Sequence, residues 1–145
     1  MNICVRPATE ADIGAIFDIR TSVRENHLSL EQLADLGVTP AAISQAIAAA
    51  PCLWIAEVDG QPAAFAMADA DDACVFAAFV RPGLEGRGLG RMLMAKAEAY
   101  LFATHRTIWL VTDGNSRASG FYRKLGWLPV AALDGGDVRF EKHTP

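Results

Sequence analysis

A glycine-rich segment in the middle of the chain, residues 80–91, is the stretch best suited to bind a charged ligand. An apolar run before it and an amphipathic stripe after it predict that it joins a strand to a helix. Glycines let the backbone approach a ligand closely, and the first turn of a helix offers unpaired N–H groups at the positive end of its dipole. Gly88 and Gly90 in such a turn would form an anion site suited to phosphate, flanked by the positive charges of Arg87 and Arg91.

The spacing of these glycines differs from two well-known phosphate-binding motifs. A P-loop requires lysine directly after its second glycine, but Leu89 follows Gly88. A dinucleotide-binding fingerprint requires glycine where Arg91 stands, and an acidic residue about 20 positions further on, where Ile108 lies in an apolar run. A nucleotide-dependent oxidoreductase is therefore disfavoured. The simpler interpretation, that the glycines only shape a strand-to-helix turn, stays open.

A second polar and aromatic segment, residues 115–127, follows a predicted strand. Asn115 is expected to cap a helix, because asparagine is favoured at that position. Phe121 is expected to face the core, with Tyr122 offset from that stripe, and Gly126 is expected to end the helix as its C′ glycine. Taken alone, these residues have ordinary structural interpretations as a cap and as packing.

Periodicity predicts the elements that must position both segments. Thr9 begins a helix whose apolar stripe has one exception, Arg20, and Asp59-Gly60 predicts a hairpin because both central turn positions need positive φ. Strands are expected near residues 3–5 and at 53–58, 62–68, 74–80, 107–111, 127–132 and 138–141, and helices after 9, 29, 40 and 88 and at 116–125. This order predicts an α/β sandwich with a mixed sheet.

Composition narrows the class of protein. The 145 residues suffice for one domain, 52% of them are hydrophobic, and no apolar run approaches the roughly 18 residues of a membrane span. A net charge of −4 disfavours nucleic acid as a partner. Cys4, Cys52 and Cys74 are scattered and the histidines lie far apart, so we expect no metal site and a reducing cytoplasmic location. The N-terminus is interpreted as mature sequence and not as a signal peptide.

The two segments occur in the order found in the GNAT superfamily of N-acetyltransferases, which the sequence resembles over nearly its whole length. In that family a V-x-P pattern ends the fourth strand, a pyrophosphate loop Q/R-x-x-G-x-G/A follows, and a later helix carries N-x-x-A-x-x-F/L-Y-x-x-x-G-F/W. The matching residues are Val80, Pro82, Gly88, Gly90, Asn115, Ala118, Phe121, Tyr122, Gly126 and Trp127. Glu85 stands at the Q/R position, where a carboxylate would repel phosphate. We expect affinity to survive, because backbone N–H groups supply most of the grip of such a loop.

The resemblance implies a GNAT-like fold in a single domain over residues 1–145, with a mixed, mostly antiparallel sheet of six to seven strands flanked by helices on both faces. It also implies that acetyl-CoA is the cofactor and that the acetyl group passes to an amine by direct attack in a ternary complex. Asn115 would bind the CoA arm, Tyr122 would protonate the leaving thiolate, and a backbone N–H near Phe79 or Val80 would bind the thioester carbonyl. The implied cofactor-binding residues are Phe79, Val80, Arg87, Gly88, Leu89, Gly90, Arg91, Asn115, Ala118 and Tyr122.

The general base is not indicated by any motif. Many members of the family use a carboxylate on the fourth strand, but residues 74–79 contain none. Glu25 and His27, in the loop after the first helix, and Asp69 are the candidates, and each can equally be a solvated surface residue. We take Glu25 as the first candidate for contact with the acceptor and as a catalytic residue together with Tyr122.

The acceptor is expected to be a small-molecule amine or a peptide amine. The acidic loop at residues 69–72 leans slightly towards a cationic amine, although a solvated turn is the simpler interpretation. Members of the family often dimerise, and we expect an exposed strand edge near Val138 and Phe140 as one contact in a homodimer. Two alternatives remain open: a non-catalytic module of the same fold that senses acyl-CoA, and an enzyme that uses a longer acyl-CoA.

Overall fold

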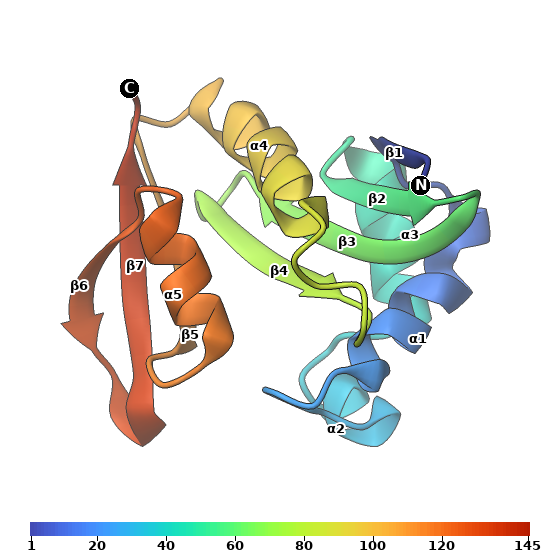
Figure 1. Ribbon diagram of the computed structural model, residues 1–145, viewed down its shortest axis with the longest axis horizontal. Helices are drawn as coiled ribbons and strands as arrows, with labels where there is room; N and C mark the ends of the chain where they lie inside the picture. Colours follow the sequence, from blue (N-terminus) through green and yellow to red (C-terminus); the bar gives the residue numbers. More distant parts are fainter.

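A seven-stranded sheet, in the order β1-β2-β3-β4-β5-β7-β6, forms the centre of the protein in a computed structural model that describes residues 1–145 (Figure 1). The strands are β1 (Ile3–Pro7), β2 (Leu53–Val58), β3 (Gln61–Asp69), β4 (Cys74–Val80), β5 (Thr107–Asp113), β6 (Leu128–Ala132) and β7 (Asp137–His143). The helices are α1 (Ile13–Ser22), α2 (Leu30–Asp35), α3 (Pro40–Ala49), α4 (Leu89–Phe102) and α5 (Arg117–Lys124), with short 3₁₀ turns at Glu10–Asp12 and Asp134–Gly136. The predicted α/β class and mixed, mostly antiparallel sheet are confirmed.

The sheet is divided at its middle. Strands β1 to β4 form one antiparallel ladder and β5, β7 and β6 form another. The ladders meet only where β4 and β5 run parallel, and there a single pair, Cys74 and Trp109, is in register. Beyond that pair β4 and β5 diverge, so the two parts of the sheet open towards the C-terminal end of β4 (Figure 1).

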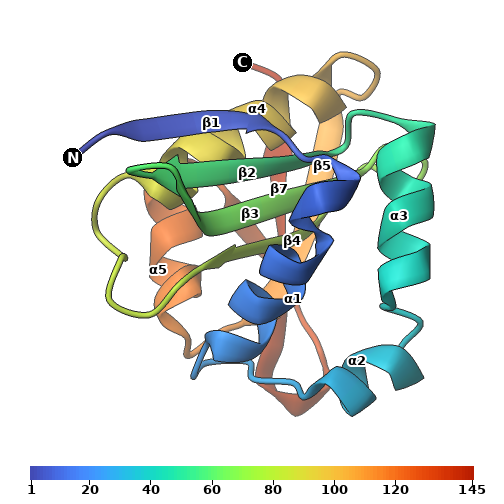
Figure 2. The ribbon, with the colours of Figure 1, turned by 90° about the vertical axis from the view of Figure 1, so that its right-hand side faces the viewer.

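Both faces of the first ladder are covered. Side chains of a strand alternate between faces, so Leu53 and Ile55 of β2 pack with α1 to α3, whereas Trp54 and Ala56 pack with α4. Figure 2 shows α1 and α3 on the near side of the sheet and α4 and α5 on the far side. Burial on both faces explains why these strands are continuous apolar runs in the sequence.

Local turn chemistry agrees with the residue types. Asp59 and Gly60 have φ of 52° and 83°, as the predicted two-residue hairpin between β2 and β3 requires. Thr9 and Asp12 form a capping box at the start of the 3₁₀ turn that leads into α1. Asp12 also pairs with Arg6 at 2.8 Å, which lowers the pKa of that carboxyl group and ties α1 to β1.

The predicted strand edge near Val138 and Phe140 is wrong. Strand β7 lies inside the sheet, between β5 and β6, and Phe140 is completely buried. The edge strand is β6, on which Leu128 and Val130 are half exposed. The sequence pattern identified the last strand but not its neighbours, because β5 and β7 pair across the intervening residues 114–136.

None of the helices has the length and apolar character needed to cross a membrane.

Candidate functional site

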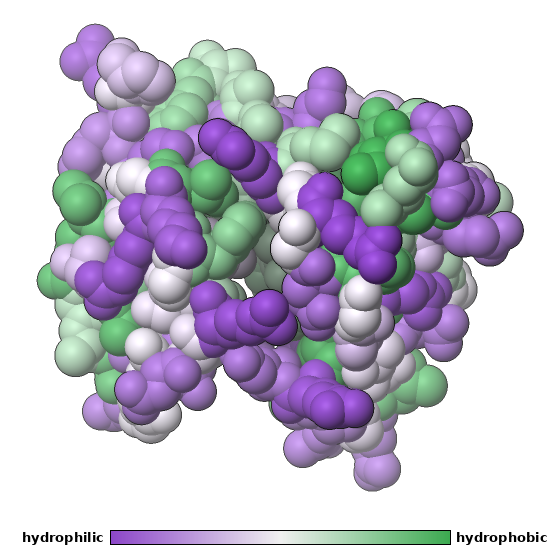
Figure 3. All heavy atoms as spheres, in the orientation of Figure 1, coloured by the Kyte–Doolittle hydropathy of each residue, from purple (hydrophilic) through white to green (hydrophobic).

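A cleft of about 920 Å³ lies where β4 and β5 diverge. Its walls come from five parts of the chain: strand β4, the glycine-rich loop with the start of α4, strand β5, helix α5, and the loop after α1. Figure 3 shows the surface hollowed between the two parts of the sheet, with hydrophilic side chains along the rim. The divergence of two neighbouring strands therefore creates a large concavity at the two segments singled out in the sequence.

The glycine-rich loop presents backbone to this cleft. Gly83, Gly86 and Gly88 have φ of +88°, +76° and +86°, which an L side chain rarely adopts. Gly88 is the N-cap of α4, and no side chain caps that helix. The N–H groups of the first turn therefore remain available to an anion at the positive end of the helix dipole.

Gly90 is needed for a different reason. Its φ is not positive, and a Cβ at this position would lie 3.1 Å from Cζ of Phe121 in α5. That distance is tighter than an ordinary contact, so the absent side chain lets α5 approach α4 closely. Gly88 permits the turn of the loop, whereas Gly90 permits the packing of the helix that carries Tyr122.

Among the charged residues Glu85, Arg87 and Arg91, two line the cleft and one does not. Arg91 lines the cleft, whereas Arg87 does not, and its guanidinium lies 3.6 Å from the sulfur of Met1. Glu85 also lines the cleft, and one of its oxygens accepts a hydrogen bond of 2.9 Å from the N–H of Gly83. The loop thus holds its own carboxylate by a main-chain hydrogen bond.

Helix α5 begins one residue later than predicted. Ser116 is the N-cap and accepts a hydrogen bond from the N–H of Ser119, so the prediction of Asn115 as the cap is wrong. The reason is an Asx turn, in which the carboxylate of Asp113 accepts from the N–H of Asn115 and shifts the helix start. Asn115 is exposed and is not among the residues that line the cleft, whereas Ala118 is.

Tyr122 is held in place by main-chain hydrogen bonds at the end of α5 and by packing of its ring. Its carbonyl accepts from the N–H of Trp127, and Gly126 donates to Arg123, which is the Schellman pattern of a helix ended by glycine. The ring packs among Phe121, Trp127 and Phe140 while lining the cleft. Burial raises the pKa of Tyr122 to about 12, so its hydroxyl stays protonated and able to donate a hydrogen bond throughout the neutral range.

Strand β4 offers backbone donors along its open edge. The N–H of Arg81 donates to Ala63 of β3, and N–H directions alternate along a strand. The N–H of Val80 therefore points to the other side, where β5 has already diverged, and that of Phe79 points to β3. Of the two positions expected to bind a carbonyl, geometry favours Val80.

Comparison with known proteins agrees with this site. The model of the acetyltransferase (GNAT) family matches residues 15–127, which is more than half of the chain. The chain belongs to the GNAT family. Enzymes of this family are acetyl-CoA-dependent acyltransferases, and acetyl-CoA is accordingly the cofactor of this protein.

Solved structures with the same fold cover almost the whole chain. The PaiA N-acetyltransferase of Thermoplasma acidophilum, in complex with coenzyme A, has a TM-score of 0.79 at 16% identity, covering 99% of this chain and 100% of that one. An N-acetyltransferase of Staphylococcus aureus has a TM-score of 0.78 at 16% identity, covering 99% of both chains. The ribosomal-protein-S18-alanine N-acetyltransferase of Escherichia coli has a TM-score of 0.72 at 18% identity, covering 98% and 94%. At these identities the likeness concerns the fold.

The cleft of this GNAT protein fits an acyl-CoA by its own chemistry. The uncapped N-terminus of α4 and the positive-φ glycines suit the pyrophosphate, and Arg91 adds positive charge. The open edge of β4 suits the amides of the pantetheine arm. Of the residues expected to bind the cofactor, Phe79, Val80, Gly88, Leu89, Gly90, Arg91, Ala118 and Tyr122 line the cleft, whereas Arg87 and Asn115 do not.

The three candidates for the general base are separated by the fold. Glu25 lines the cleft, and one of its oxygens accepts from the N–H of Arg117 at 2.9 Å, which joins the loop after α1 to the start of α5. His27 is outside the lining, and its Nδ1 lies 3.0 Å from the carbonyl of Val23. Asp69 is the last residue of β3, beside the start of β4, and its carboxylate accepts from the N–H groups of Asp71 and Asp72 in its own turn. The acidic loop thus lies away from the cleft.

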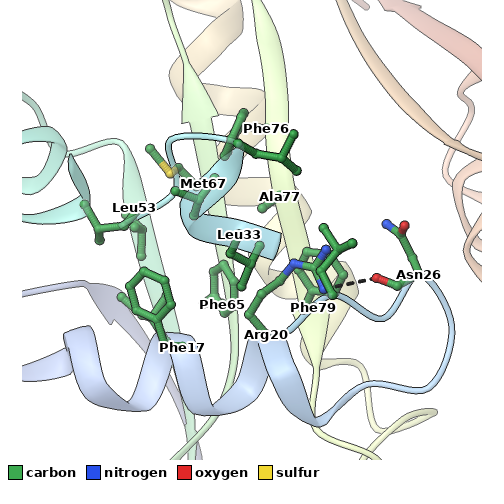
Figure 4. Close-up of a pocket in the computed structure, with 15 residues that line it drawn as sticks. Phe17, Arg20, Asn26, Leu33, Leu53, Phe65, Met67, Phe76, Ala77 and Phe79 are labelled. Atoms are coloured by element: carbon green, nitrogen blue, oxygen red, sulfur yellow. Dashed lines mark hydrogen bonds between the residues drawn. The ribbon is translucent and has the colours of Figure 1, made fainter. Parts of the chain in front are cut away.

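A second, smaller cavity lies beside the cleft, under α1, α2 and α3. It has a volume of about 150 Å³, and 13 of its 15 lining residues are hydrophobic (Figure 4). Its two polar lining residues are Arg20 and Asn26. The cleft and this pocket share Asn26, Phe76, Ala77 and Phe79, so they meet at β4. Periodicity marked Arg20 only as an exception on an apolar stripe, and nothing in the sequence placed it in a cavity.

Proposed function

We propose that this protein transfers the acetyl group of acetyl-CoA directly to a primary amine while both substrates are bound. The observation that carries the proposal is the common wall of the two cavities, formed by Phe76, Ala77 and Phe79 of β4. A donor in the cleft and an acceptor in the pocket would meet at that wall, so no intermediate carrier on the protein is needed.

The reaction forms a C–N bond and breaks a C–S bond. When bound, acetyl-CoA supplies an acetyl group activated as a thioester. The amine nitrogen loses a proton, and the departing thiolate gains one. The N–H of Val80 is the proposed donor to the carbonyl oxygen, where negative charge develops as the nitrogen attacks.

Tyr122 is the proposed proton donor to the thiolate. A thiol has a pKa of about 8.5, far below the value of about 12 to which burial raises the pKa of Tyr122. The tyrosine anion is therefore strongly disfavoured, and Tyr122 must regain a proton as soon as it gives one. Over the whole reaction the proton that the amine gives to Glu25 offsets the proton that Tyr122 gives to the thiolate, and exchange with water in the open cleft restores both groups.

Glu25 is the proposed acceptor of the amine proton. Only two carboxylates line the cleft, and the other, Glu85, is held within the glycine loop. Glu25 borders the cleft beside Asn26, which also lines the pocket. An amine with a pKa of about 10 is only about one part in a thousand neutral at pH 7, so such assistance is needed there.

The cysteines support direct transfer over a covalent acetyl-enzyme. None of the three lines the cleft or the pocket. Burial raises the pKa of Cys74 to about 11 and also raises that of Cys52, which disfavours the reactive thiolate. Cys4 is exposed on β1, an edge strand that does not line the cleft. Three free thiols are in keeping with the reducing cytoplasm as the proposed location.

The test is a calorimetric titration with acetyl-CoA, followed by initial-rate kinetics with an amine panel. We expect saturable one-to-one binding without acceptor, release of free thiol only with an acceptor, and intersecting double-reciprocal plots. Parallel plots, together with an acetylated protein detected by mass spectrometry, would contradict direct transfer. Binding without thiol release from any amine would instead favour the non-catalytic sensing module.

A further inference from the structure

Arg20 is a buried cation without an anionic partner. It lies near the end of α1, is only 8% exposed and takes part in none of the ion pairs of the molecule. Its guanidinium donates one hydrogen bond, of 3.1 Å, to the carbonyl of Asn26 and stacks on the ring of Phe79, with 4.2 Å from Cζ to the ring centroid. Burial lowers its pKa, but an arginine remains charged.

This arrangement leaves most of the guanidinium unused. An arginine has five N–H donors in a planar fork, and Arg20 spends one of them on Asn26. No fully enclosed side-chain nitrogen or oxygen in the molecule lacks a hydrogen-bond partner, so the remaining nitrogens of Arg20 reach open space. The cavity that Arg20 lines is the apolar pocket, and its free donors therefore face that volume.

The pocket has a polar mouth and an apolar interior. Arg20 contacts Phe79, and both Phe79 and Asn26 also line the cleft, so the guanidinium lies where the two cavities meet. Figure 4 shows Arg20 directed towards Phe79 and Asn26, with Phe17 and Leu53 at the opposite end of the group. A volume of about 150 Å³ is enough for a group the size of benzene.

We propose that this pocket binds the acceptor and that Arg20 recognises a carboxylate attached close to the reacting amine, so that the acceptor is an α-amino acid with an apolar side chain. The inference rests on the proposed function and deepens it. A planar carboxylate matches the fork of a guanidinium in a bidentate pair. The side chain fills the apolar interior, and the amine remains at the mouth, beside β4.

Arg20 could in principle bind a carboxylate on the acceptor or one on the acyl group of the donor, and its position in the pocket distinguishes the two. In an α-amino acid the amine and the carboxylate share one carbon, so both lie at the mouth while the side chain extends inward. In a dicarboxylic acyl group the carboxylate lies beyond a methylene chain and would reach into the interior, which Phe17, Leu53 and other hydrophobic side chains line. The mouth position of Arg20 therefore favours the amino acid.

Binding of the product tests the proposal without turnover. We compare N-acetyl-L-leucine with its amide, which differs only in lacking the carboxylate charge, by calorimetry on the full chain. The wild-type protein is expected to bind the acid at least about 30-fold more tightly. In Arg20→Gln the two ligands are expected to bind equally. Arg106 is an exposed arginine just before β5, and Arg106→Gln is the control that keeps the preference. Arg20→Met serves if the glutamine variant does not fold, because an apolar replacement of a buried charge is often tolerated.

Kinetics separate this inference from the proposed function. With acetyl-CoA, kcat/KM for L-leucine is expected to exceed that for isoamylamine, which lacks only the carboxylate, at least about 30-fold, and Arg20→Gln should remove the difference. Acetylation of isoamylamine as efficiently as leucine would overturn the role of Arg20 while leaving the enzyme intact. Faster transfer from succinyl-CoA to isoamylamine would assign Arg20 to the donor and equally overturn it. No thiol release from any amine would instead contradict the proposed function.

Discussion

The cleft and the pocket are two cavities that meet at one strand but are built in different ways. The cleft presents main-chain groups: the N–H groups of the glycine loop, the free first turn of α4 and the open edge of β4. The pocket is lined by side chains from α1, α2, α3, β2, β3 and β4. Every chain has the same main-chain groups, so the donor cleft can stay constant while the sequence around it changes.

The difference teaches where specificity resides. A main-chain site recognises what all donors share, whereas a side-chain pocket changes its ligand when a single residue changes. In this protein that residue is Arg20, the one charged group in the apolar pocket. Substitutions in the two cavities should therefore affect different kinetic parameters.

Tyr122→Phe should have the largest effect and should leave both affinities unchanged. Loss of the hydroxyl removes the proposed proton donor but keeps the ring among its neighbours, so kcat should fall at least tenfold, and up to about a hundredfold. Because burial raises the pKa of Tyr122 to about 12, the group stays protonated below that pH. The kcat profile of the wild type should therefore show no alkaline decline from Tyr122 between about pH 7 and 10. Unchanged turnover in the variant would remove Tyr122 from the mechanism.

Glu25→Gln should have a smaller, pH-dependent effect. Glutamine keeps an oxygen that can accept from the N–H of Arg117, so the loop after α1 stays attached to α5. Without the proposed base, kcat/KM for the acceptor should fall about tenfold at pH 7. The deficit should shrink towards pH 10, where more of the amine is already neutral. A deficit that is constant with pH would indicate a purely structural contact.

A pair of glycine variants should have the smallest effect on turnover. They should distinguish the glycine that shapes the anion site from the glycine that lets α4 and α5 pack closely. Gly88→Ala places a Cβ at φ of +86°, which costs about 1–2 kcal/mol. We expect the free loop to relax out of this strained turn and to regain it only when it binds phosphate, so acetyl-CoA should bind about five- to thirtyfold more weakly in calorimetry. Gly90→Ala needs only a small shift of Phe121 and should change thermal stability more than acetyl-CoA affinity. The reverse ranking would mean that Gly90, and not Gly88, shapes the anion site.

Local features of the fold could be predicted because each depends on a few neighbouring residues. The hairpin at Asp59-Gly60 and the C′ glycine Gly126 follow directly from the positive φ that those turns require. The insertion of β7 between β5 and β6 does not, because pairing partners distant in sequence leave no local signal. The N-cap of α5 is Ser116 and not Asn115, because the carboxylate of Asp113 accepts a hydrogen bond from the N–H of Asn115 in a turn before the helix. Asparagine and serine both cap helices well, so the sequence alone does not distinguish between them.

In the candidate site, too, features formed by neighbouring residues could be predicted and features formed by distant residues could not. The glycine loop and the Tyr122 helix are contiguous, so their motifs are visible in the sequence. The pocket combines residues that lie between Ile16 and Phe79, and its polar member was visible only as a charge on an apolar stripe of α1. Burial without an anionic partner distinguishes Arg20, and burial is a property of the three-dimensional structure.

The single pairing of Cys74 with Trp109 also has a mechanical consequence. Elsewhere in the sheet, pulling neighbouring strands apart breaks a ladder of directional hydrogen bonds, which makes each half stiff. Across this seam the halves are joined mainly by the apolar core around Leu93, Ile108 and Phe140, whose attraction is non-directional and tolerates small displacements. We therefore expect compliance to be concentrated along this line, so that small displacements of the two halves change the width of the cleft.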